Sequence, residues 1–474
     1  MNPKLLSDVA YLTSAILFIV GLKFLSHPRS ARRGNQLAAI GMALAVVASL
    51  IFIWGGGHIE HGSDAGILII VGILIGGVAG TIGARRVAIT EMPQMVALLN
   101  GCGGGAAALI SVVEYSRYMH AGESVDALGF GATLFGLIIG SLSFWGSLVA
   151  FGKLSGFMEK AITSTFQKLL TGAIFLGLIT TLVWIGMGGG MNAFHLLIVL
   201  SFFFAILMVV PIGGADMPVV ISLLNSFTGL AVAATGFSLR EPALIISGTL
   251  VGASGTLLTL LMCKAMNRSI TNVLFAGVGS GAVAASGGGA AGGAPKNVRE
   301  ISLEDTAVLL ANVSSVVIVP GYGMAVAQAQ HAARELADML AKQGVEVKYA
   351  IHPVAGRMPG HMNVLLAEAN VPYEQLFDLE QINPEFERTD VVLVVGANDV
   401  VNPAARHDKT SPIYGMPILD VDKAKHVIII KRSLKPGFAG IDNELYYDPK
   451  TMMLFGDAKG VLSKLVEELK TQAA

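Results

Sequence analysis

The fold is decided by the stretch Val316-Val317-Ile318-Val319-Pro320-Gly321-Tyr322-Gly323. Four β-branched residues in a row are typical of a buried strand, and the proline and glycines after them are typical of a turn. An amphipathic helix is predicted next, from about Met324 to Lys342, and Gly344 closes it. The stretch therefore predicts the first strand of an alternating strand-and-helix domain.

Four further strands and three further helices continue the alternation around this stretch. The strands are expected at 345–351, 391–395, 427–430 and 452–455, and the helices at about 303–312, 361–370 and 457–470. Ser302 and Asp305 form a capping pattern for the first of these helices. Continuous apolar strands that alternate with helices predict a parallel sheet covered on both faces. Residues 301–474 are therefore expected to adopt an α/β, doubly wound, Rossmann-like fold with ligands at the carboxyl ends of the strands.

The turn after the first strand predicts a site for a pyrophosphate group. Gly321 permits a tight turn, and Gly323 lets the backbone approach a phosphate at the N-terminus of the following helix. The usual third glycine is missing, because Val326 stands in its place. A plain tight turn therefore remains the alternative interpretation of this glycine pair.

A second phosphate site is predicted at Lys431-Arg432-Ser433, directly after the strand that ends at Ile430. A planar guanidinium, a compact ammonium and a hydroxyl suit a dianionic phosphate. In an adenine dinucleotide this group would be the 2′-phosphate of NADP. His352 follows the second strand, where an NAD site would have an acidic residue. These residues favour NADP, and a solvated basic pair is the alternative.

Two further loops after predicted strands carry polar side chains. Arg357 lies in the loop 354–360, and Asn398 and Asp399 lie in the loop 396–403. Loops in these positions usually carry function on this fold. Arg357 and Asp399 are therefore expected to contact a ligand.

Charge is spread unevenly along the chain. Of the 65 charged residues, 22 fall in residues 1–263 and 43 in residues 264–474. The chain is 53% hydrophobic and 14% charged, whereas a soluble domain carries about a quarter charged residues. The net charge of -1 offers no basic surface for nucleic acid, and Cys102 and Cys263 lie in apolar runs, so neither a disulfide framework nor a metal site is expected. The composition excludes an ordinary soluble globule, a disordered chain and a nucleic-acid binder.

Nine apolar segments have the length of about 20 residues that a membrane helix needs. They are centred in 8–26, 36–54, 65–83, 93–113, 127–150, 169–188, 193–211, 217–237 and 243–263. The loops on one side of these spans hold eleven Lys and Arg residues, and those on the other side hold three. The N-terminus is therefore expected outside and the C-terminal body in the cytoplasm.

Glycine residues and polar residues inside the spans are expected to have different roles. Glycines four apart, such as Gly136 with Gly140 and Gly248 with Gly252, let helix backbones approach closely. Polar residues face the bundle interior, because hydrocarbon offers them no partner. Those near or within spans include Glu91, Asn100, His195, Asp216, Asn225, Ser226 and Thr228. Hydrogen bonds between helices are one interpretation, and a solvated proton path is the other. The candidate residues of that path are Glu91, Asn100, Asp216 and Asn225.

Residues 277–294 separate the two bodies. Glycine and alanine dominate this segment, which predicts a flexible tether without a core. The expected organisation is a transmembrane domain over 1–265, a linker and lead-in over 266–300, and a nucleotide-binding domain over 301–474.

Four motifs resemble those of the beta subunits of proton-translocating NAD(P) transhydrogenases. They occupy residues 320–330, 352–357, 396–399 and 431–433. The likeness extends over essentially the whole chain, including the runs 90–93 and 213–218 before the fourth and eighth spans. The resemblance implies that the sheet domain binds NADP(H) and that NAD(H) is bound by an alpha subunit. A dimer of such heteromers, embedded in membrane lipid and free of nucleic acid, is the implied assembly.

The resemblance also implies roles for individual residues. The residues expected to contact NADP(H) are Gly321, Tyr322, Gly323, Met324, Ala325, Val354, Ala355, Gly356, Arg357, Met358, Pro359, Gly396, Ala397, Asn398, Asp399, Lys431, Arg432, Ser433, Gly437, Phe438, Asp457 and Ala458. Gly321 to Ala325 would line the pyrophosphate, Arg357 would sit by the phosphates, and the run 431–433 would hold the 2′-phosphate. Asp399 would lie near the nicotinamide and couple protonation to nucleotide binding without acting as an acid or base. Residues 435–440 would form a lid, in which Phe438 stands where relatives often have tyrosine.

Asn100 occupies the position at which some relatives have a titrating histidine. Neither Asn100 nor Asn225 titrates near neutral pH, so the titrating group is expected on the partner, with both amides relaying through water. The implied activity is hydride transfer between NADH on the partner and NADP⁺ on this chain. The resemblance couples that transfer to proton translocation into the cytoplasm across a bacterial inner membrane.

Two other functions remain open. A transporter or channel gated by an NADP-sensing domain would predict a carbonyl filter loop or a charged ring, and the sequence has neither signature. A membrane-anchored reductase that pumps nothing would not need nine spans with polar residues inside them.

Overall fold

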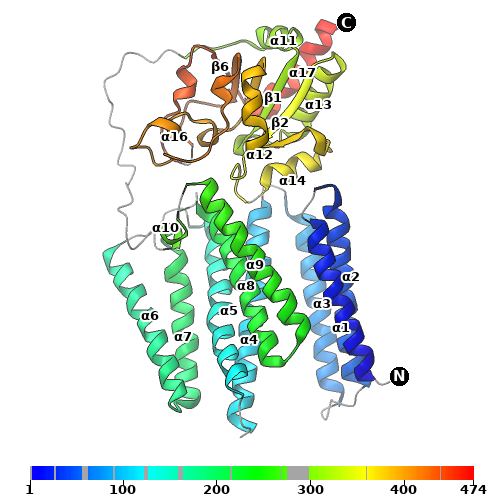
Figure 1. Ribbon diagram of the computed structural model, residues 1–474, viewed down its shortest axis with the longest axis vertical. Coiled ribbons are helices and arrows are strands. Elements are labelled where there is room, and N and C mark those ends of the chain that lie inside the picture. The colour runs from blue at the N-terminus through cyan, green and yellow to red at the C-terminus, as the bar shows by residue number, and fades with distance from the viewer. Residues whose placement is uncertain are drawn as a thin grey trace. The chain divides into compact units, whose positions relative to one another are not determined.

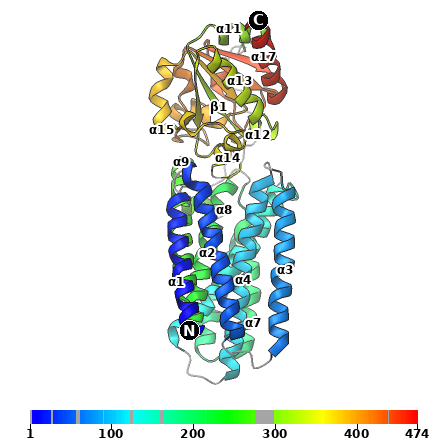
Figure 2. The ribbon, with the colours of Figure 1, turned by 90° about the vertical axis from the view of Figure 1, so that its right-hand side faces the viewer.

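The computed structural model describes residues 3–25, 28–55, 62–88, 91–121, 126–158, 164–213, 216–267, 269–274, 298–358, 360–437 and 439–473. The chain divides into two compact units, one made of residues 1–211 and 221–257 and the other of residues 212–220 and 258–474. Long helices occupy the N-terminal part of the sequence and a parallel sheet with helices follows (Figures 1 and 2). The predicted fold class is therefore confirmed. The tether predicted at 277–294 lies outside the described residues.

Among the residues that the structure describes, nine helices are long and apolar enough to cross a membrane. They are α1 (Pro3–Leu25), α2 (Pro28–Gly55), α3 (Gly62–Arg86), α4 (Met92–Ala121), α5 (Ala127–Leu154), α6 (Thr165–Gly186), α7 (Gly190–Val209), α8 (Met217–Leu239) and α9 (Pro242–Ala265). Each coincides with a predicted span, so the predicted count is confirmed. α4 continues past the predicted end at residue 113, and Arg117 pairs with Glu114 at 2.7 Å along its last turns.

Glycines in α4, α5, α8 and α9 lie where helices touch. A Cβ atom at Gly140 would lie 2.7 Å from the carbonyl oxygen of Gly104, and one at Gly229 would lie 2.3 Å from the backbone nitrogen of Gly252. Neither distance leaves room for a side chain, so these helices pack backbone to backbone. The packing interpretation of the span glycines is confirmed here. On α3, in contrast, no described atom lies within 4 Å of the Cβ positions of Gly72, Gly76, Gly77 and Gly80.

The second unit contains a parallel sheet with the strand order β3-β2-β1-β4-β5-β6. The strands are β1 (Ser315–Pro320), β2 (Glu346–Ile351), β3 (Leu376–Asp378), β4 (Val391–Val395), β5 (His426–Lys431) and β6 (Thr451–Phe455). The five predicted strands are confirmed. The sequence did not predict β3, because three residues are too few to show a strand pattern. The strand order reverses between β1 and β4, and ligands bind at such a switch point.

Helices cover both faces of this sheet. α17 (Ala458–Ala473) packs against both α11 (Leu303–Ala311) and α13 (Gln330–Lys342), and α14 (His361–Glu368) packs against α13 (Figure 2). The shorter elements are α10 (Ile270–Leu274), α12 (Tyr322–Val326), η3 (Tyr373–Gln375), α15 (Leu379–Ile382), η4 (Asn383–Arg388), η5 (Asp399–Val401), α16 (Ala404–His407), η6 (Val421–Lys423) and η7 (Glu444–Tyr447). The backbone N–H of Asp305 donates to the Ser302 hydroxyl at 3.0 Å, so the predicted N-cap of α11 is confirmed.

The single helix predicted from Met324 to Lys342 is wrong. The chain forms α12, turns through Gln328 in a left-handed conformation (φ 50°), and begins again as α13. The run of alanines here favours a continuous helix, but tertiary contacts override that preference. The start of α12 is tied to the loop after β4, because Gly323 N–H donates to the Gly396 carbonyl at 2.9 Å, while α13 packs against α17. One straight helix cannot satisfy both contacts.

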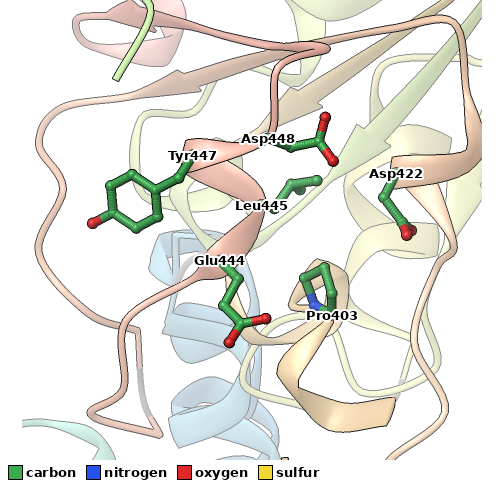
Figure 3. Close-up of a pocket in the computed structure, with 6 residues that line it drawn as sticks. All are labelled: Pro403, Asp422, Glu444, Leu445, Tyr447 and Asp448. Carbon is green, nitrogen blue, oxygen red and sulfur yellow. The ribbon is translucent and has the colours of Figure 1, made fainter. Parts of the chain in front are cut away.

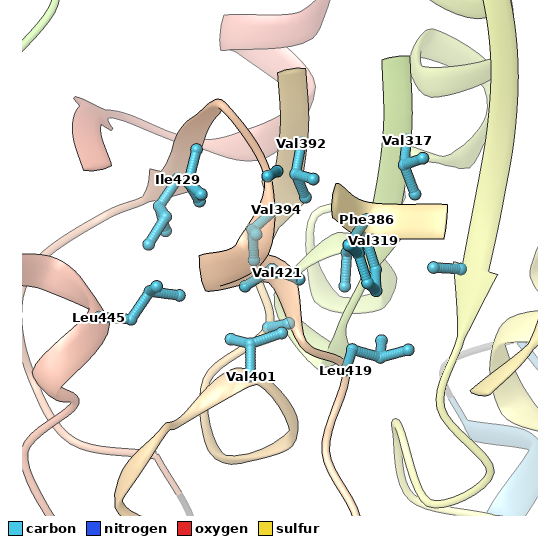
Figure 4. Close-up of a cluster of buried hydrophobic side chains, with 14 of the residues drawn as sticks. Val317, Val319, Phe386, Val392, Val394, Val401, Leu419, Val421, Ile429 and Leu445 are labelled. Atoms are coloured by element: carbon cyan, nitrogen blue, oxygen red, sulfur yellow. The ribbon is translucent and has the colours of Figure 1, made fainter. Parts of the chain in front are cut away.

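Alternate residues of the central strands fill a core on each face of the sheet. On one face, Val317, Val319, Val392, Val394 and Ile429 are buried together with residues of η4, η5 and η7 (Figure 4). Their strand neighbours on the other face are also buried. A parallel sheet buried on both faces holds its loops in fixed positions at the strand ends. Those loops carry the predicted nucleotide-binding residues.

Candidate functional site

Two glycine loops meet at the switch point between β1 and β4. Gly321 N–H donates to the Val395 carbonyl at 2.9 Å, and a Cβ atom at Gly321 would lie 2.3 Å from the Cα of Ala397. Gly396 adopts a positive φ of 66°, and a Cβ atom there would lie 2.5 Å from the Cα of Gly323. The sequence suggested that these glycines admit a phosphate. In the structure they also allow the two loops to pack closely, because side chains at these positions would drive the loops apart.

Tyr322 and Arg357 face each other beside these glycine loops. The Arg357 guanidinium lies 4.7 Å from the centre of the Tyr322 ring. Burial raises the pKa of Tyr322, and the charge of Arg357 opposes that rise. Met324 and Ala325, which follow Gly323 in α12, are fully buried. The structure therefore brings the first glycine loop and the Arg357 loop to one edge of the sheet.

His361, which the sequence did not single out, holds the Arg357 loop in place. Its Nδ1 accepts a hydrogen bond from the backbone N–H of Arg357 at 3.1 Å. Gly356, at a positive φ of 109°, lies so close that a Cβ atom there would be 2.4 Å from the same nitrogen. Burial first, and then the charge of Arg357, lower the pKa of His361. A neutral imidazole therefore accepts this hydrogen bond.

His352 anchors the beginning of the same loop. It is buried after β2, where its Nε2 lies 2.7 Å from the Pro417 carbonyl and its Nδ1 accepts from the Val354 N–H at 3.2 Å. One neutral tautomer satisfies both bonds, and burial lowers the pKa of His352 to about 4. Ala355 and Met358 are buried behind the loop, and Pro359 lies outside the described residues.

The three residues of the predicted 2′-phosphate site differ in exposure. Lys431 is half-buried, and its Nζ donates to the Lys435 carbonyl at 2.6 Å and to the Tyr446 hydroxyl at 2.7 Å. Burial lowers the pKa of Lys431, and the charges of Asp399 and Asp442 oppose that change. Arg432 is exposed and Ser433 is half-buried. Lysine therefore lies on the inner side of this site and arginine on its outer side.

The Asp399 loop meets the predicted lid. The backbone N–H of Ala439 donates to Asp399 Oδ2 at 3.1 Å, and a Cβ atom at Gly437 would lie 2.7 Å from Asp399 Oδ1. The backbone carbonyl of Asn398 accepts from Asn443 Nδ2 at 3.1 Å. These contacts bring the ends of β4 and β5 together. Phe438, the aromatic residue of the lid, lies outside the described residues.

Asp457 and Ala458 begin α17 at the end of β6. Asp457 is exposed, and its Oδ2 accepts from the Gly460 N–H at 3.3 Å, while Ala458 is buried. Asp457 therefore caps a helix, a role that leaves its predicted contact with the nucleotide open.

In the membrane helices, Asn100 is the centre of a polar cluster. Its Nδ2 donates to Ser147 at 3.0 Å and to Ser143 at 3.3 Å, and its Oδ1 accepts from the Thr228 hydroxyl at 2.8 Å. The cluster joins α4, α5 and α8. Asn225 is exposed and lies outside this cluster. Of the other candidates for a proton path, Glu91 is exposed at the start of α4 and Asp216 is buried before α8, and His195 is exposed on α7.

The described part of the sheet domain also has two surface pockets. One, of about 410 Å³, is lined by Pro403, Asp422, Glu444, Leu445, Tyr447 and Asp448. In Figure 3, Tyr447 and Asp422 lie at opposite ends of the lining residues, and the Tyr447 ring points away from Asp422. The other, of about 290 Å³, lies at the amino ends of β1 and β2 and is lined by residues that include Ser315, Lys348 and Arg388. Neither pocket contains a predicted nucleotide-binding residue.

Comparisons with known proteins give a single answer along the whole chain. Residues 7–468 match the family model described as NAD(P) transhydrogenase beta subunit. Two curated relatives from Rhodospirillum rubrum, one of them from a named strain, are both called NAD(P) transhydrogenase subunit beta. Each is 48% identical to this chain over 475 residues, which is 98% of this chain and 99% of the relative.

Proposed function

Because this chain belongs to the NAD(P) transhydrogenase beta-subunit family, we propose that it binds NADP(H) and couples hydride transfer to proton translocation. The observation that carries the proposal is the placement of two phosphate-binding patterns at the carboxyl ends of neighbouring strands. The glycine loops follow β1 and β4 and contact each other at the switch point, and Lys431 is the last residue of β5, the next strand. An alpha subunit supplies the NAD(H) site, and the active complex is a dimer of these heteromers in the membrane.

The donor set at the sheet edge fits a phosphorylated dinucleotide. The backbone of residues Gly321 to Ala325 lines the pyrophosphate, and Arg357, stacked on Tyr322, neutralises its charge. Lys431, Arg432 and Ser433 hold the 2′-phosphate, with lysine approaching it from inside and arginine from solvent. The remaining predicted contacts, in the loops 354–359 and 396–399, the lid 435–440 and the start of α17, surround the rest of the coenzyme.

Hydride transfer between two nicotinamides needs no acid or base from this chain. The bound coenzymes supply the redox chemistry, and the protein aligns them and excludes water. The lid contributes by packing Gly437 and Ala439 onto Asp399. In this position Asp399 lies next to both the nicotinamide and the lid. Its protonation state therefore affects nucleotide binding.

The proton moves through the membrane helices by way of Asn100. Its bonds with Ser143, Ser147 and Thr228 form a continuous polar contact between three helices, which supports a water-assisted relay. Glu91, Asp216 and Asn225 lie along the proposed path, and a group on the alpha subunit titrates. The N-terminus faces outward and the sheet domain faces the cytoplasm of a bacterial inner membrane. Proton passage and nucleotide binding then alter each other reciprocally.

The test is hydride transfer from NADH to an NADP⁺ analogue by the complete alpha–beta complex in sealed vesicles. The proposal expects acidification or alkalinisation of the lumen during turnover, and a rate that changes when an uncoupler is added. A rate insensitive to the uncoupler, with no pH change, would favour a reductase that pumps nothing. Nucleotide binding without turnover would favour a nucleotide-gated transporter.

The matched binding test uses Lys431→Gln and Arg432→Gln in the same complex. Each removes a charge opposite the 2′-phosphate, so the dissociation constant of NADP⁺ is expected to rise about tenfold or more. Lys464→Gln is the control, because Lys464 is an exposed residue of α17 beyond the predicted contacts at the start of that helix. Equal affinity of the unmodified complex's beta subunit for NAD⁺ and NADP⁺ would contradict the proposal.

A further inference from the structure

Tyr446 is a buried aromatic residue whose hydroxyl contacts two loops of the proposed coenzyme site. It lies in η7, between the lid and β6, and is only 1% exposed. The hydroxyl accepts a hydrogen bond from Lys431 Nζ at 2.7 Å and bonds with the side-chain amide of Asn398 at 2.8 Å. The ring also lies beneath the ammonium, 4.8 Å from its centre to Nζ. No motif in the sequence distinguishes this tyrosine from Tyr447 beside it.

The ring and the hydroxyl of Tyr446 have separate roles. The ring belongs to the apolar core beneath β4 and β5, among residues such as Val394, Ile429 and Leu445. Packing alone would be satisfied by phenylalanine. The hydroxyl adds one polar atom in that core, and a buried phenol keeps such an atom only when it finds partners. Both of its partners come from the carboxyl ends of strands, Lys431 from β5 and Asn398 from the loop after β4.

Lys431 needs such a partner more than Arg432 does. An ammonium is a compact charge at the end of a flexible stem, and fixing that stem costs conformational entropy. In the structure the Lys435 carbonyl and the Tyr446 hydroxyl fix the ammonium from two sides. A lysine that is already held in position loses less entropy when a phosphate binds.

We infer that Tyr446 is a positioning residue that sets the preference for the phosphorylated coenzyme by holding Lys431 at the 2′-phosphate. This inference rests on the proposed function, because it takes the 2′-phosphate to lie at Lys431. Tyr446 makes no contact with the coenzyme in this account. It acts through Lys431, and through Asn398 it connects the phosphate end of the site to the loop that carries Asp399.

The experiment compares Tyr446→Phe with Tyr447→Phe in the complete alpha–beta complex. Each change removes one phenol hydroxyl and keeps the ring. The Tyr447 hydroxyl donates at 3.1 Å to Oδ1 of Asp442, which is not a residue of the proposed coenzyme site, so this variant is the matched control. The dissociation constants and KM values of NADP⁺ and of NAD⁺ at the beta-subunit site are measured for both variants.

Tyr446→Phe is expected to weaken NADP⁺ about tenfold, because a hydrogen bond to a charged group is lost. KM for NADP⁺ should rise with kcat nearly unchanged, and NAD⁺ affinity should change less than twofold. Tyr447→Phe should leave all four values unchanged. In a Lys431→Gln background, Tyr446→Phe should add no further loss, because the two residues act as one unit.

An equal loss of affinity for NADP⁺ and NAD⁺ in Tyr446→Phe would overturn the inference, since it would mean a structural role alone. A Tyr446→Phe variant indistinguishable from Tyr447→Phe would overturn it as well. If the variant is less stable, the ratio of the two dissociation constants still decides, because unfolded protein lowers both apparent affinities equally. Failure of the proposed function has a different signature, which is the absence of any preference for NADP⁺ in the unaltered complex.

Discussion

The membrane helices and the sheet domain use glycine for the same geometric purpose in different surroundings. Between α8 and α9, Gly229 meets Gly252, and at the switch point of the sheet Gly321 meets the backbone of Ala397. In both places a Cβ atom would lie 2.3 Å from a backbone atom of the neighbouring segment. One contact joins two long helices, and the other joins two loops at a proposed ligand site. Both regions therefore use close backbone contact at glycine. In the membrane it packs two helices, and in the sheet domain it shapes a proposed ligand site.

The two regions differ in how they distribute apolar side chains. On α3, Leu68 is 70% exposed and Ile75 is 66% exposed, whereas Val392 and Ile429 in the sheet are fully buried. Lipid is as apolar as leucine, so α3 loses nothing by exposing its side chains to the membrane. The strands face water unless helices cover them, and the hydrophobic effect buries them. The same residue types therefore occupy opposite positions because the two regions have different solvents.

The largest effect is expected for Gly321→Ala. Its Cβ would clash with backbone atoms of the loop after β4, which cannot shift cheaply, so the domain should lose about 3 kcal/mol of unfolding free energy. The dissociation constant of NADP⁺ should rise at least tenfold, as measured by titration calorimetry on the complex. Gly460→Ala is the control, because no described atom lies within 4 Å of its Cβ position on α17. Equal effects of both variants would show that the glycine contact between the loops is unimportant.

Gly229→Ala should separate the corresponding helices in the membrane. Overpacking of this kind costs about 2 kcal/mol, and it should lower the thermal midpoint of the complex in detergent and its rate of proton translocation. Affinity for NADP⁺ should change less than it does in Gly321→Ala. The matched variant Gly76→Ala on α3, where the Cβ position is open, should leave both measurements unchanged. A normal midpoint for Gly229→Ala would contradict the close packing of α8 and α9.

Acid should destabilise the sheet domain through His352. Its folded-state pKa of about 4 lies below the value of about 6.5 expected when unfolded, so its neutral form stabilises the fold above pH 6.5 and that stability is lost as pH falls towards 4. Between pH 7 and pH 5 the loss from this group is about 2 kcal/mol. Hydrogen exchange of the strand amides measures it.

His352→Gln is the control for this pH effect. Glutamine can still donate to the Pro417 carbonyl but does not titrate, so the variant should be less stable at pH 7 and lose less on acidification. An unchanged pH dependence in the variant would assign the acid sensitivity to other groups.

The smallest effects should come from removing one hydroxyl in each region. Ser302→Ala removes the N-cap of α11 and should cost about 1 kcal/mol of unfolding free energy. Ser238→Ala removes a hydroxyl that bonds with Thr133 at 2.7 Å between α8 and α5, and should cost about 0.6 kcal/mol. Denaturant titrations of both variants measure the two losses of unfolding free energy, one in the water-exposed sheet domain and one in the membrane helices. A cost above about 2 kcal/mol for Ser238→Ala would mean that membrane hydrogen bonds here are stronger than is usual.

The sequence predicted some residues of the candidate site and missed others. It located Arg357, Asp399 and Lys431, because strands that alternate with helices must end at one edge of the sheet. It did not find His361 or Tyr446, because a buried histidine and a core tyrosine have no local signature. It proposed Asn225 with Asn100 for the proton path, which stays a prediction, and it did not predict that the Thr228 hydroxyl bonds with Asn100. Which residues contact NADP(H) remains a prediction.

The nine spans, five strands and the order of the two regions could be predicted from the sequence alone, because length, periodicity and hydropathy are properties of neighbouring residues. The break in the chain at Gln328, the place of β3 in the sheet and the packing of Gly321 against Ala397 appear only in the folded domain. The same is true of the contact between Tyr446 and Asn398, which lies 48 residues away in the chain. Such contacts depend on which distant segments meet, and folding brings them together only when the whole domain is packed.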